Sequence, residues 1–177
     1  MRTSRLTSLC CAAVLLAAPA APAQPKAPKP GPEHDRLRQM EGTWEATVKS
    51  DHGESKGTVT YKADLNGLWL LGEFQGEFGG QKFRGRSIDG YDVTKKKYFS
   101  VWIDSMSTAP MLSEGTFDKA GKVLTLHGEG PGMDGKPTKF KLVTELKDKD
   151  TMLFTMSGPD KDGKDRVMMT ITYKRKK

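Results

Sequence analysis

The segment Trp102–Met106 places a large aromatic ring, a carboxylate, a hydroxyl and a thioether within a few residues of one another. Alternate side chains of an extended strand share a face, so Trp102 and Asp104 are expected to point the same way. If that face lines a cavity, it offers a stacking surface and a hydrogen-bond acceptor, which suit a small amphipathic ligand. The alternative is that Trp102 packs in a core while Asp104 and Ser105 hydrogen-bond a turn.

Two glutamates and one histidine on other expected strands could join this segment. Glu73 and Glu114 fall on neighbouring central strands, and paired carboxylates in one cavity could do acid–base chemistry. His127 could bind haem or a metal if its strand face points inward; a solvated or hydrogen-bonded histidine is the alternative. We name no catalytic residue, and the candidate ligand-binding residues are Trp102, Asp104, Glu73, Glu114 and His127.

The sequence lacks a complete signature for nucleotide or metal chemistry. Gly130–Gly135 has the glycine spacing of a dinucleotide loop, but Pro137 stands where a P-loop needs Ser or Thr, and a strand pattern follows instead of a helix. Residues 160–165 hint at a calcium loop, but the glycine comes fourth instead of sixth. Both segments predict hairpin loops, and we expect no metal and no cofactor.

Charge is concentrated at the ends of the chain. The sequence has 29 Lys and Arg against 22 Asp and Glu, for a net charge of +7. Residues 33–173 hold 21 of the basic and all 22 of the acidic side chains, while the tail Lys174–Lys177 is entirely basic. Nucleic-acid affinity needs cations clustered on the folded domain, so we expect no nucleic-acid partner.

Residues 1–23 have the pattern of a cleaved export signal. A basic start, Met1–Arg5, precedes an uncharged apolar run, and Ala21-Pro22-Ala23 gives the small-x-small pattern of a cleavage site. The run is shorter than a permanent membrane span. We therefore expect cleavage after about Ala23, no stable membrane insertion, and an exported protein that is periplasmic or extracellular. Both cysteines lie in this segment, so disulfides and cysteine nucleophiles are not expected in the mature protein.

The remaining chain predicts a proline-rich linker at 24–32, followed by one domain at 33–177. The linker favours an extended spacer. A short helix is expected at 33–40, and the pattern then changes to strands separated by Gly, Asn, Asp and Pro turns. The expected strands are 43–49, 57–62, 68–77, 81–88, 97–104, 111–117, 122–128, 138–147, 151–157 and 166–174.

Ten short strands without intervening helices favour an all-β antiparallel architecture. An up-and-down barrel of about ten strands hides every strand edge and has room inside for side chains or one small ligand. The short N-terminal helix could plug one end. A two-sheet sandwich is the alternative.

The start of the first strand, Gly42-Thr43-Trp44, resembles the Gly-x-Trp signature of lipocalin-like (calycin) barrels. In those barrels the tryptophan closes the floor, and a basic residue near the end of the last strand stacks on it. The resemblance therefore implies structural roles for Gly42 and Trp44, with Arg175 as the matching basic residue. Cation–π attraction would give the pairing its physical basis.

A wider set of segments is similar to an uncharacterised bacterial exported family, domain of unknown function 1579. The similarity covers about residues 33–177 and implies a lipocalin-like barrel, but it carries over no activity. The segments that carry it are Gly42-Thr43-Trp44, Gly90-Tyr91-Asp92, Tyr98 with Trp102–Met106, Glu114–Asp118 and Tyr173-Lys174-Arg175.

Three functional hypotheses follow from the sequence. The first is non-catalytic binding of a small hydrophobic or amphipathic ligand in the barrel. The second is a hydrolase-type enzyme that uses Glu73, Asp104 or Glu114, and it requires two of these carboxylates to meet in an open pocket. The third is a structural or interaction module of the cell envelope that uses an outer face or the basic tail, with protein partners unknown.

Overall fold

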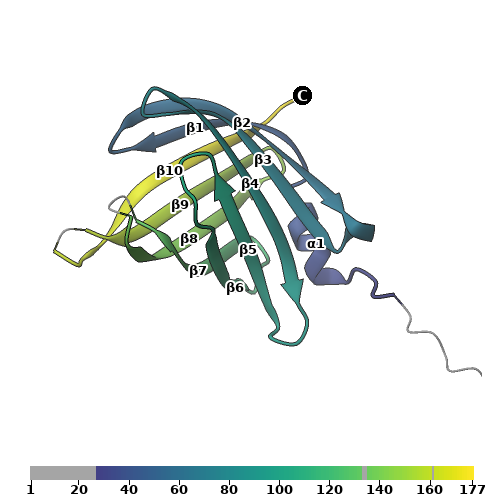
Figure 1. Cartoon of the computed structure of the whole chain (residues 1–177). Helices are drawn as coiled ribbons and strands as arrows, with labels where there is room; N and C mark the ends of the chain where they lie inside the picture. Colours follow the sequence, from purple (N-terminus) through teal and green to yellow (C-terminus); the bar gives the residue numbers. More distant parts are fainter. Residues whose placement is uncertain (1–26, 133–134, 161) are drawn as a thin grey trace, which may run out of the picture.

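The computed structural model describes residues 27–132, 135–160 and 162–177. The expected signal peptide at 1–23 and residues 24–26 of the expected linker lie outside the described residues. The described chain forms one short helix and ten antiparallel strands (Figure 1). The elements are α1 (Pro32–Arg38), β1 (Gly42–Ser50), β2 (Gly53–Asp64), β3 (Trp69–Phe78), β4 (Gln81–Asp92), β5 (Lys97–Asp104), β6 (Met111–Phe117), β7 (Val123–Pro131), β8 (Pro137–Asp148), β9 (Thr151–Pro159) and β10 (Asp165–Arg175), with a 3₁₀ turn at Leu65–Gly67.

The ten strands close into a barrel. Each strand pairs with its neighbours in sequence, and the first strand pairs with the last, with Trp44 opposite Arg175 and Val48 opposite Ile171. This closure leaves no strand edge free for pairing with another chain. The expectation of an up-and-down barrel is confirmed, and the two-sheet sandwich is wrong.

Every expected strand is present, and most are longer than the sequence pattern indicated. The strand expected at 81–88 continues to Asp92, and the one expected at 122–128 continues to Pro131. The helix expected at 33–40 ends at Arg38. Leu37 in the helix and Met40 just after it are both buried. A helix this short is not stable on its own in water, so its stability comes from packing on the barrel.

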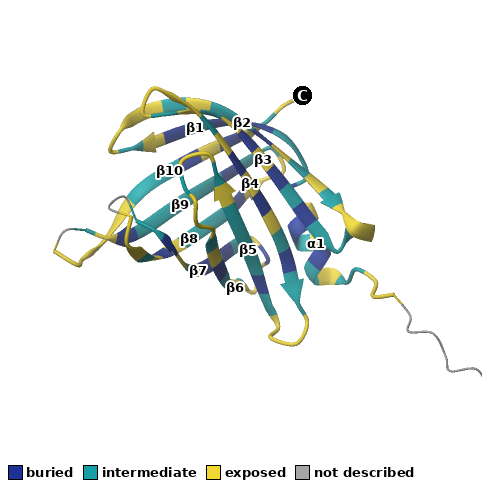
Figure 2. Ribbon diagram, viewed as in Figure 1, coloured by how far each residue is buried: buried dark blue, intermediate teal, exposed yellow. Residues whose placement is uncertain are grey.

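Side chains alternate between a buried inner face and an exposed outer face along the strands (Figure 2). In β1, for example, Trp44, Ala46 and Val48 are buried while Glu45 and Lys49 are exposed. This is the period of two that antiparallel strands impose. Whether a residue lies on the inner or the outer face therefore decides whether its side chain can contact a molecule inside the barrel.

The two ends of the barrel differ. At the closed end, α1 lies over the barrel beside the turns that follow β2, β4, β6 and β8 (Figure 1). A Cβ on Gly67 would fall 2.5 Å from Arg38 Nη2, and one on Gly121 would fall 3.3 Å from Arg36 Nε, so arginines of the helix segment lie beside two of these turns. The open end is formed by the hairpin loops after β1, β3, β5, β7 and β9. None of the described helices is long and apolar enough to span a membrane.

Candidate functional site

The barrel encloses a cavity of about 770 Å³. It extends from Met40 at the closed end to the hairpin loops of the open end, and side chains from all ten strands line it. Exposed residues of the open end, including His52, Met106 and Thr108, also line it, so the cavity reaches the protein surface there. Its volume lies within the range of pockets that hold small organic ligands.

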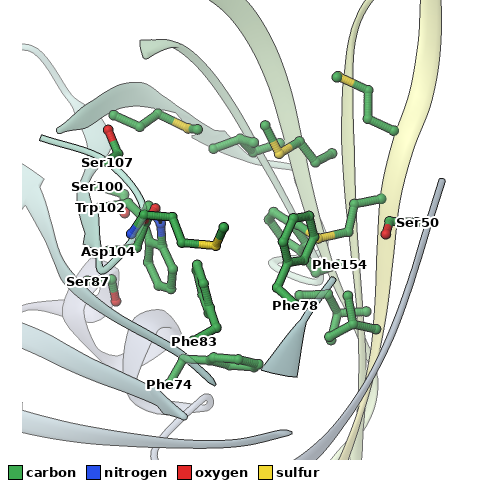
Figure 3. Close-up of a pocket in the computed structure, with 18 of the residues that line it drawn as sticks. Ser50, Phe74, Phe78, Phe83, Ser87, Ser100, Trp102, Asp104, Ser107 and Phe154 are labelled. Atoms are coloured by element: carbon green, nitrogen blue, oxygen red, sulfur yellow. Dashed lines mark hydrogen bonds between the residues drawn. The ribbon is translucent and has the colours of Figure 1, made fainter. Parts of the chain in front are cut away.

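Aromatic rings form one wall of this cavity. Phe83 stands between Trp102, whose ring stacks on it at 6.4 Å, and Phe74, whose ring meets it at 5.8 Å with its plane inclined by 67°. Phe78 lies 6.0 Å from Phe83. These rings come from β3, β4 and β5, and Figure 3 shows their side chains pointing into a common space. Stacked and inclined rings at these distances are mutually stabilising.

Trp102 and Asp104 do share the inner face of β5, and both line the cavity. The Trp102 indole Nε1 donates a hydrogen bond to Asp104 Oδ2 at 2.9 Å, and the backbone N–H of Met106 donates to Asp104 Oδ1 at 2.8 Å. The carboxylate therefore fixes the indole ring and also holds the first residues of the loop after β5. Phe99, Val101 and Ile103 occupy the outer face, where Ile103 is exposed instead of belonging to a core.

A row of polar side chains crosses the inner wall nearer the closed end. Asp89 on β4 is paired with Ser100 on β5, which is paired in turn with Ser113 on β6. The Ser87 hydroxyl donates a hydrogen bond to Asp89 Oδ2 at 2.7 Å, and Ser100 hydrogen-bonds the same carboxyl. Asp89 is half-buried and faces the cavity, and desolvation inside the barrel raises its pKa even though the two serines favour the charged form.

Two tyrosines lie close to this polar row. The hydroxyls of Tyr61 on β2 and Tyr173 on β10 hydrogen-bond to each other, and both line the cavity. Burial raises the pKa of each phenol, so both stay neutral near pH 7. Gly72 lies between Tyr61 and Ser87 in adjacent strands, and a Cβ there would fall 2.7 Å from the Tyr61 ring. Glycine at this position lets the two polar side chains approach.

Methionines and aliphatic residues form much of the remaining lining. Thioethers adapt their shape to irregular contents more readily than branched side chains do. A register shift in β10 between Val167 and Met169 lets two consecutive methionines face the cavity. Figure 3 shows thioether sulfurs spread around the space. The methionines that line the cavity are Met40, Met106, Met111, Met156, Met168 and Met169.

The expectation that Glu73 faces the cavity is wrong. Its neighbours Gly72 and Phe74 occupy the inner face of β3, so the alternation of the strand places Glu73 outside. There its carboxylate forms an ion pair with Arg86 at 2.9 Å, and its side chain is 56% exposed.

The expectation that Glu114 and His127 face the cavity is also wrong. The two residues are directly paired across β6 and β7 on the outer surface, because Ser113 and Leu126 take the inner positions. Lys97 and then Lys95 hold the pKa of Glu114 below its usual range through hydrogen bonds at 2.6 and 3.1 Å. Neither residue can meet a ligand inside the barrel.

Asp89 is one of several cavity-lining residues that the sequence analysis missed, along with Phe83 and Tyr61. Its strand was expected to end at residue 88, which left Asp89 in a turn. A signal was available, because Phe83, Ser87 and Asp89 alternate with the exposed residues Arg84, Arg86 and Ile88. Extending that alternation by one step would have placed a carboxylate on the inner face.

Gly42, Trp44 and Arg175 meet at the closed end in the arrangement that the resemblance implies. The Arg175 guanidinium carbon lies 3.9 Å from the centroid of the Trp44 ring. Trp44 is 1% exposed, and its Nε1 donates to the Met40 carbonyl at 2.9 Å. Gly42 has φ of +115°, and a Cβ there would fall 2.6 Å from Arg175 Nη1. Glycine thus satisfies both the backbone and the space that the arginine needs.

Arg175 also joins the helix to the last strand. Its guanidinium donates to the carbonyls of Glu41, Gln39 and Lys149, the last two at 3.1 and 2.7 Å. These carbonyls belong to the segment after α1 and to the turn between β8 and β9. The cluster therefore seals the closed end, and the cavity begins above it.

The described residues contain no group of three or more His, Cys, Asp or Glu side chains placed to hold a metal ion. Between β9 and β10, Asp160 Oδ1 accepts from the backbone N–H groups of Asp162 and Lys164 at 2.9 and 2.8 Å. Its carboxylate oxygen is thus used by the turn itself, as expected for an Asx turn.

The chain belongs to the family described as protein of unknown function DUF1579, whose model matches residues 29–175. The match covers nearly the whole of the described chain. No curated protein shows significant sequence similarity to it.

Solved structures confirm the class of fold. The chain is similar to Rv2717c from M. tuberculosis, with a TM-score of 0.61 and 11% identity over 83% of this chain and 99% of that one. It is also similar to the S-type phycobiliprotein lyase CPES from Guillardia theta, with a TM-score of 0.54 and 11% identity over 84% of this chain and 99% of that one. These neighbours are lipocalin-like barrels, and at this identity they establish the fold alone.

Proposed function

We propose that this protein binds a small hydrophobic or amphipathic ligand inside the barrel and does no chemistry on it. The observation that carries this proposal is the 770 Å³ cavity, whose largely apolar lining opens at one end of a sealed barrel. Protein interiors are normally close-packed, and a small barrel can be filled by its own side chains, so a hollow interior indicates a function that uses the space. Ligand burial supplies one, because it removes exposed aromatic and thioether surface from water.

The positions of the carboxylates argue against the hydrolase hypothesis. Of the three residues that it invoked, only Asp104 faces the cavity. Asp89 and Asp104 both line it, but Asp89 is paired with Ser100 and therefore lies four strand positions from Asp104, about 13 Å along β5. Two carboxyl groups so far apart do not form a general acid–base pair around one reacting bond.

The place of action is part of the same proposal. The basic start, apolar run and small-x-small site of residues 1–23 support export, so we place the binding function in a periplasmic or extracellular space. A ligand carrier there would shield an apolar molecule from water. The exposed outer face offers Ile103 and Leu112, but nothing on that face identifies a partner.

A fluorescence titration with N-phenyl-1-naphthylamine tests the proposal, because this dye is uncharged near neutral pH and brightens in apolar surroundings. We expect saturable one-to-one binding to the protein without residues 1–23. Native mass spectrometry of protein purified from its own host should show an added mass that denaturation releases.

Two matched variants locate the dye. Met156→Trp fills the cavity and should weaken dye binding at least tenfold. Leu112→Trp adds the same ring to the exposed outer face and should leave binding unchanged. Absence of saturable binding to the wild type, or equal binding by both variants, contradicts the proposal.

A further inference from the structure

The charges that line the cavity are unlike those of the whole chain. The chain carries a net charge of +7, yet none of the described lysines and arginines lines the cavity. Four described carboxylates do line it: Asp51, Glu77, Asp89 and Asp104. An interior that is lined by carboxylates and by none of the described lysines and arginines has an electrostatic preference, and that preference is for positive charge.

Three of these carboxylates lie near the open end, where their charges are paired or exposed. Asp51 forms an ion pair with Arg166, and Glu77 is exposed. Asp104 accepts hydrogen bonds from the Trp102 indole and from the backbone of Met106. These three groups have partners or water and need nothing further from a ligand.

Asp89 differs because it lies deep in the barrel. Its hydrogen-bond donors are the Ser87 and Ser100 hydroxyls, which are neutral, and no described Lys, Arg or His forms an ion pair with it. The Tyr61 phenol on β2 interacts electrostatically with Asp89, and it is hydrogen-bonded to the Tyr173 phenol; both phenols are neutral near pH 7. A buried carboxylate without a counter-ion costs free energy, which a bound cation would offset.

The aromatic wall lies between this carboxylate and the open end, because the Trp102 ring lies over Gly85 and hydrogen-bonds to Asp104. Ser87, two residues before Asp89, is paired with Trp102, so the indole is attached about 7 Å along the strand from the Asp89 position. Phe83 stacks beyond it. Aromatic faces attract cations, and they also hold flat apolar groups. A molecule that extends from Asp89 toward the open end can therefore lay its body along Trp102 and Phe83.

We propose that the cavity selects amphipathic ligands that carry one cationic nitrogen, which Asp89 holds while the apolar or aromatic body lies against Trp102 and Phe83. This inference rests on the proposed binding function and adds the chemical class of the ligand. An anionic ligand such as a fatty acid is disfavoured at the same depth, because its carboxylate would meet Asp89 without a counter-ion.

Competition against N-phenyl-1-naphthylamine tests the charge preference with three probes of similar size. The probes are 4-phenylbutyltrimethylammonium, its uncharged tert-butyl isostere (5,5-dimethylhexyl)benzene, and 5-phenylpentanoate. At pH 7 the cation should bind at least tenfold more tightly than the isostere, and 5-phenylpentanoate should bind most weakly. The permanent charge of the quaternary ammonium excludes titration of the probe itself.

Two variants that each remove one carboxylate assign the effect. Asp89→Asn should abolish the tenfold preference for the cation while dye affinity stays within about twofold, since Asn keeps the shape and its amide can hydrogen-bond to both serine hydroxyls. Glu73→Gln removes an equal charge from the outer face of the adjacent strand and should keep the preference intact.

The outcomes separate this inference from the function on which it rests. If the dye binds but the cation and its isostere compete equally, or if Asp89→Asn keeps the preference, the cationic ligand class is wrong and the binding function survives. If the dye does not bind the wild type at all, both are wrong. Unchanged circular dichroism of Asp89→Asn shows that a lost preference does not reflect unfolding.

Discussion

Trp44 and Trp102 show how one residue type serves two purposes in the same barrel. Trp44 at the closed end is buried on all sides, hydrogen-bonded to Met40 and covered by Arg175. Trp102 is also fixed by a hydrogen bond, to Asp104, but one side of its ring faces the cavity. The Trp44 ring completes a packed cluster, whereas the Trp102 ring borders the cavity.

The difference separates stability from binding along the barrel axis. At the closed end the helix, the first strand and the last strand converge on one arginine, so each removed group leaves a gap in a packed cluster. In the open half the rings and thioethers already border a hollow, so truncation enlarges an existing space. Substitutions at the closed end should therefore unfold the protein, and those in the open half should change what it binds.

The largest effect is expected for Trp44→Ala. Truncation of a fully buried aromatic residue typically costs about 3–5 kcal/mol of unfolding free energy, and the freed Met40 carbonyl adds to the loss. Urea unfolding followed by circular dichroism measures it. An unchanged midpoint would show that Trp44 does not hold the closed end together.

Arg175→Ala should cost about 2 kcal/mol. The variant removes the cation above the Trp44 ring and leaves the carbonyls of Gln39 and Lys149 without their donor. Lys177→Ala removes the same charge from the exposed end of the chain and should alter the unfolding free energy by less than about 0.5 kcal/mol. Equal changes in the unfolding free energy of the two variants would mean that Arg175 acts only through net charge and not through its contacts.

Trp102→Ala should affect ligand binding more than stability, which is the reverse of the effect expected for Trp44→Ala. We expect the affinity for N-phenyl-1-naphthylamine to fall about tenfold, equivalent to about 1.4 kcal/mol of binding free energy. The unfolding free energy should fall by less than it does for Trp44→Ala, because the ring already borders a cavity. A loss of stability equal to that of Trp44→Ala with unchanged dye affinity would remove the contrast between the two ends.

Asp89 should give the wild type a distinct pH dependence of stability. Burial raises the pKa of its carboxyl above the ordinary value of 3.8, so the folded state holds this proton more tightly than the unfolded state. Its contribution to stability is present below pH 3.8 and is lost as pH rises through the raised pKa. The free-energy difference between Asp89→Asn and the wild type should therefore grow in favour of the variant over that range. Urea unfolding between pH 3 and 8 measures it, and a constant difference would contradict the burial of this charge.

The smallest effect is expected on the outer face. Glu114→Gln breaks exposed ion pairs with Lys95 and Lys97, which typically contribute less than about 1 kcal/mol. The unfolding free energy should change by less than that amount, and dye affinity should not change. Altered dye affinity would show that this outer surface communicates with the cavity.

The sequence was sufficient to predict the barrel and its closed end. Turn residues separated ten patterns of extended chain, and antiparallel strands without crossover helices favour closure. The Gly42-Thr43-Trp44 segment, through its resemblance to calycin barrels, implied a floor with an arginine above the ring. Both depend on local patterns, which a single sequence displays directly.

The cavity lining was harder to predict because it depends on the face of every strand. A shift of one residue moves a side chain from the interior to the surface, as at Glu73 beside Phe74. On β3, apolar residues occur on both faces, so the pattern did not identify the inner one. Asp89 was missed for a related reason, since its strand continued beyond the expected boundary. Strand ends are set by hairpin pairing, which only the folded barrel defines.

Methionine-methyl NMR during titration with N-phenyl-1-naphthylamine tests the central claim most directly. Six methionines line the cavity, while Met152 is buried in the packed wall and does not line it. The account predicts saturable shifts of cavity methyls such as Met156, Met168 and Met169, with little change at Met152. Binding that leaves the cavity methyls unshifted would contradict a ligand site inside the barrel.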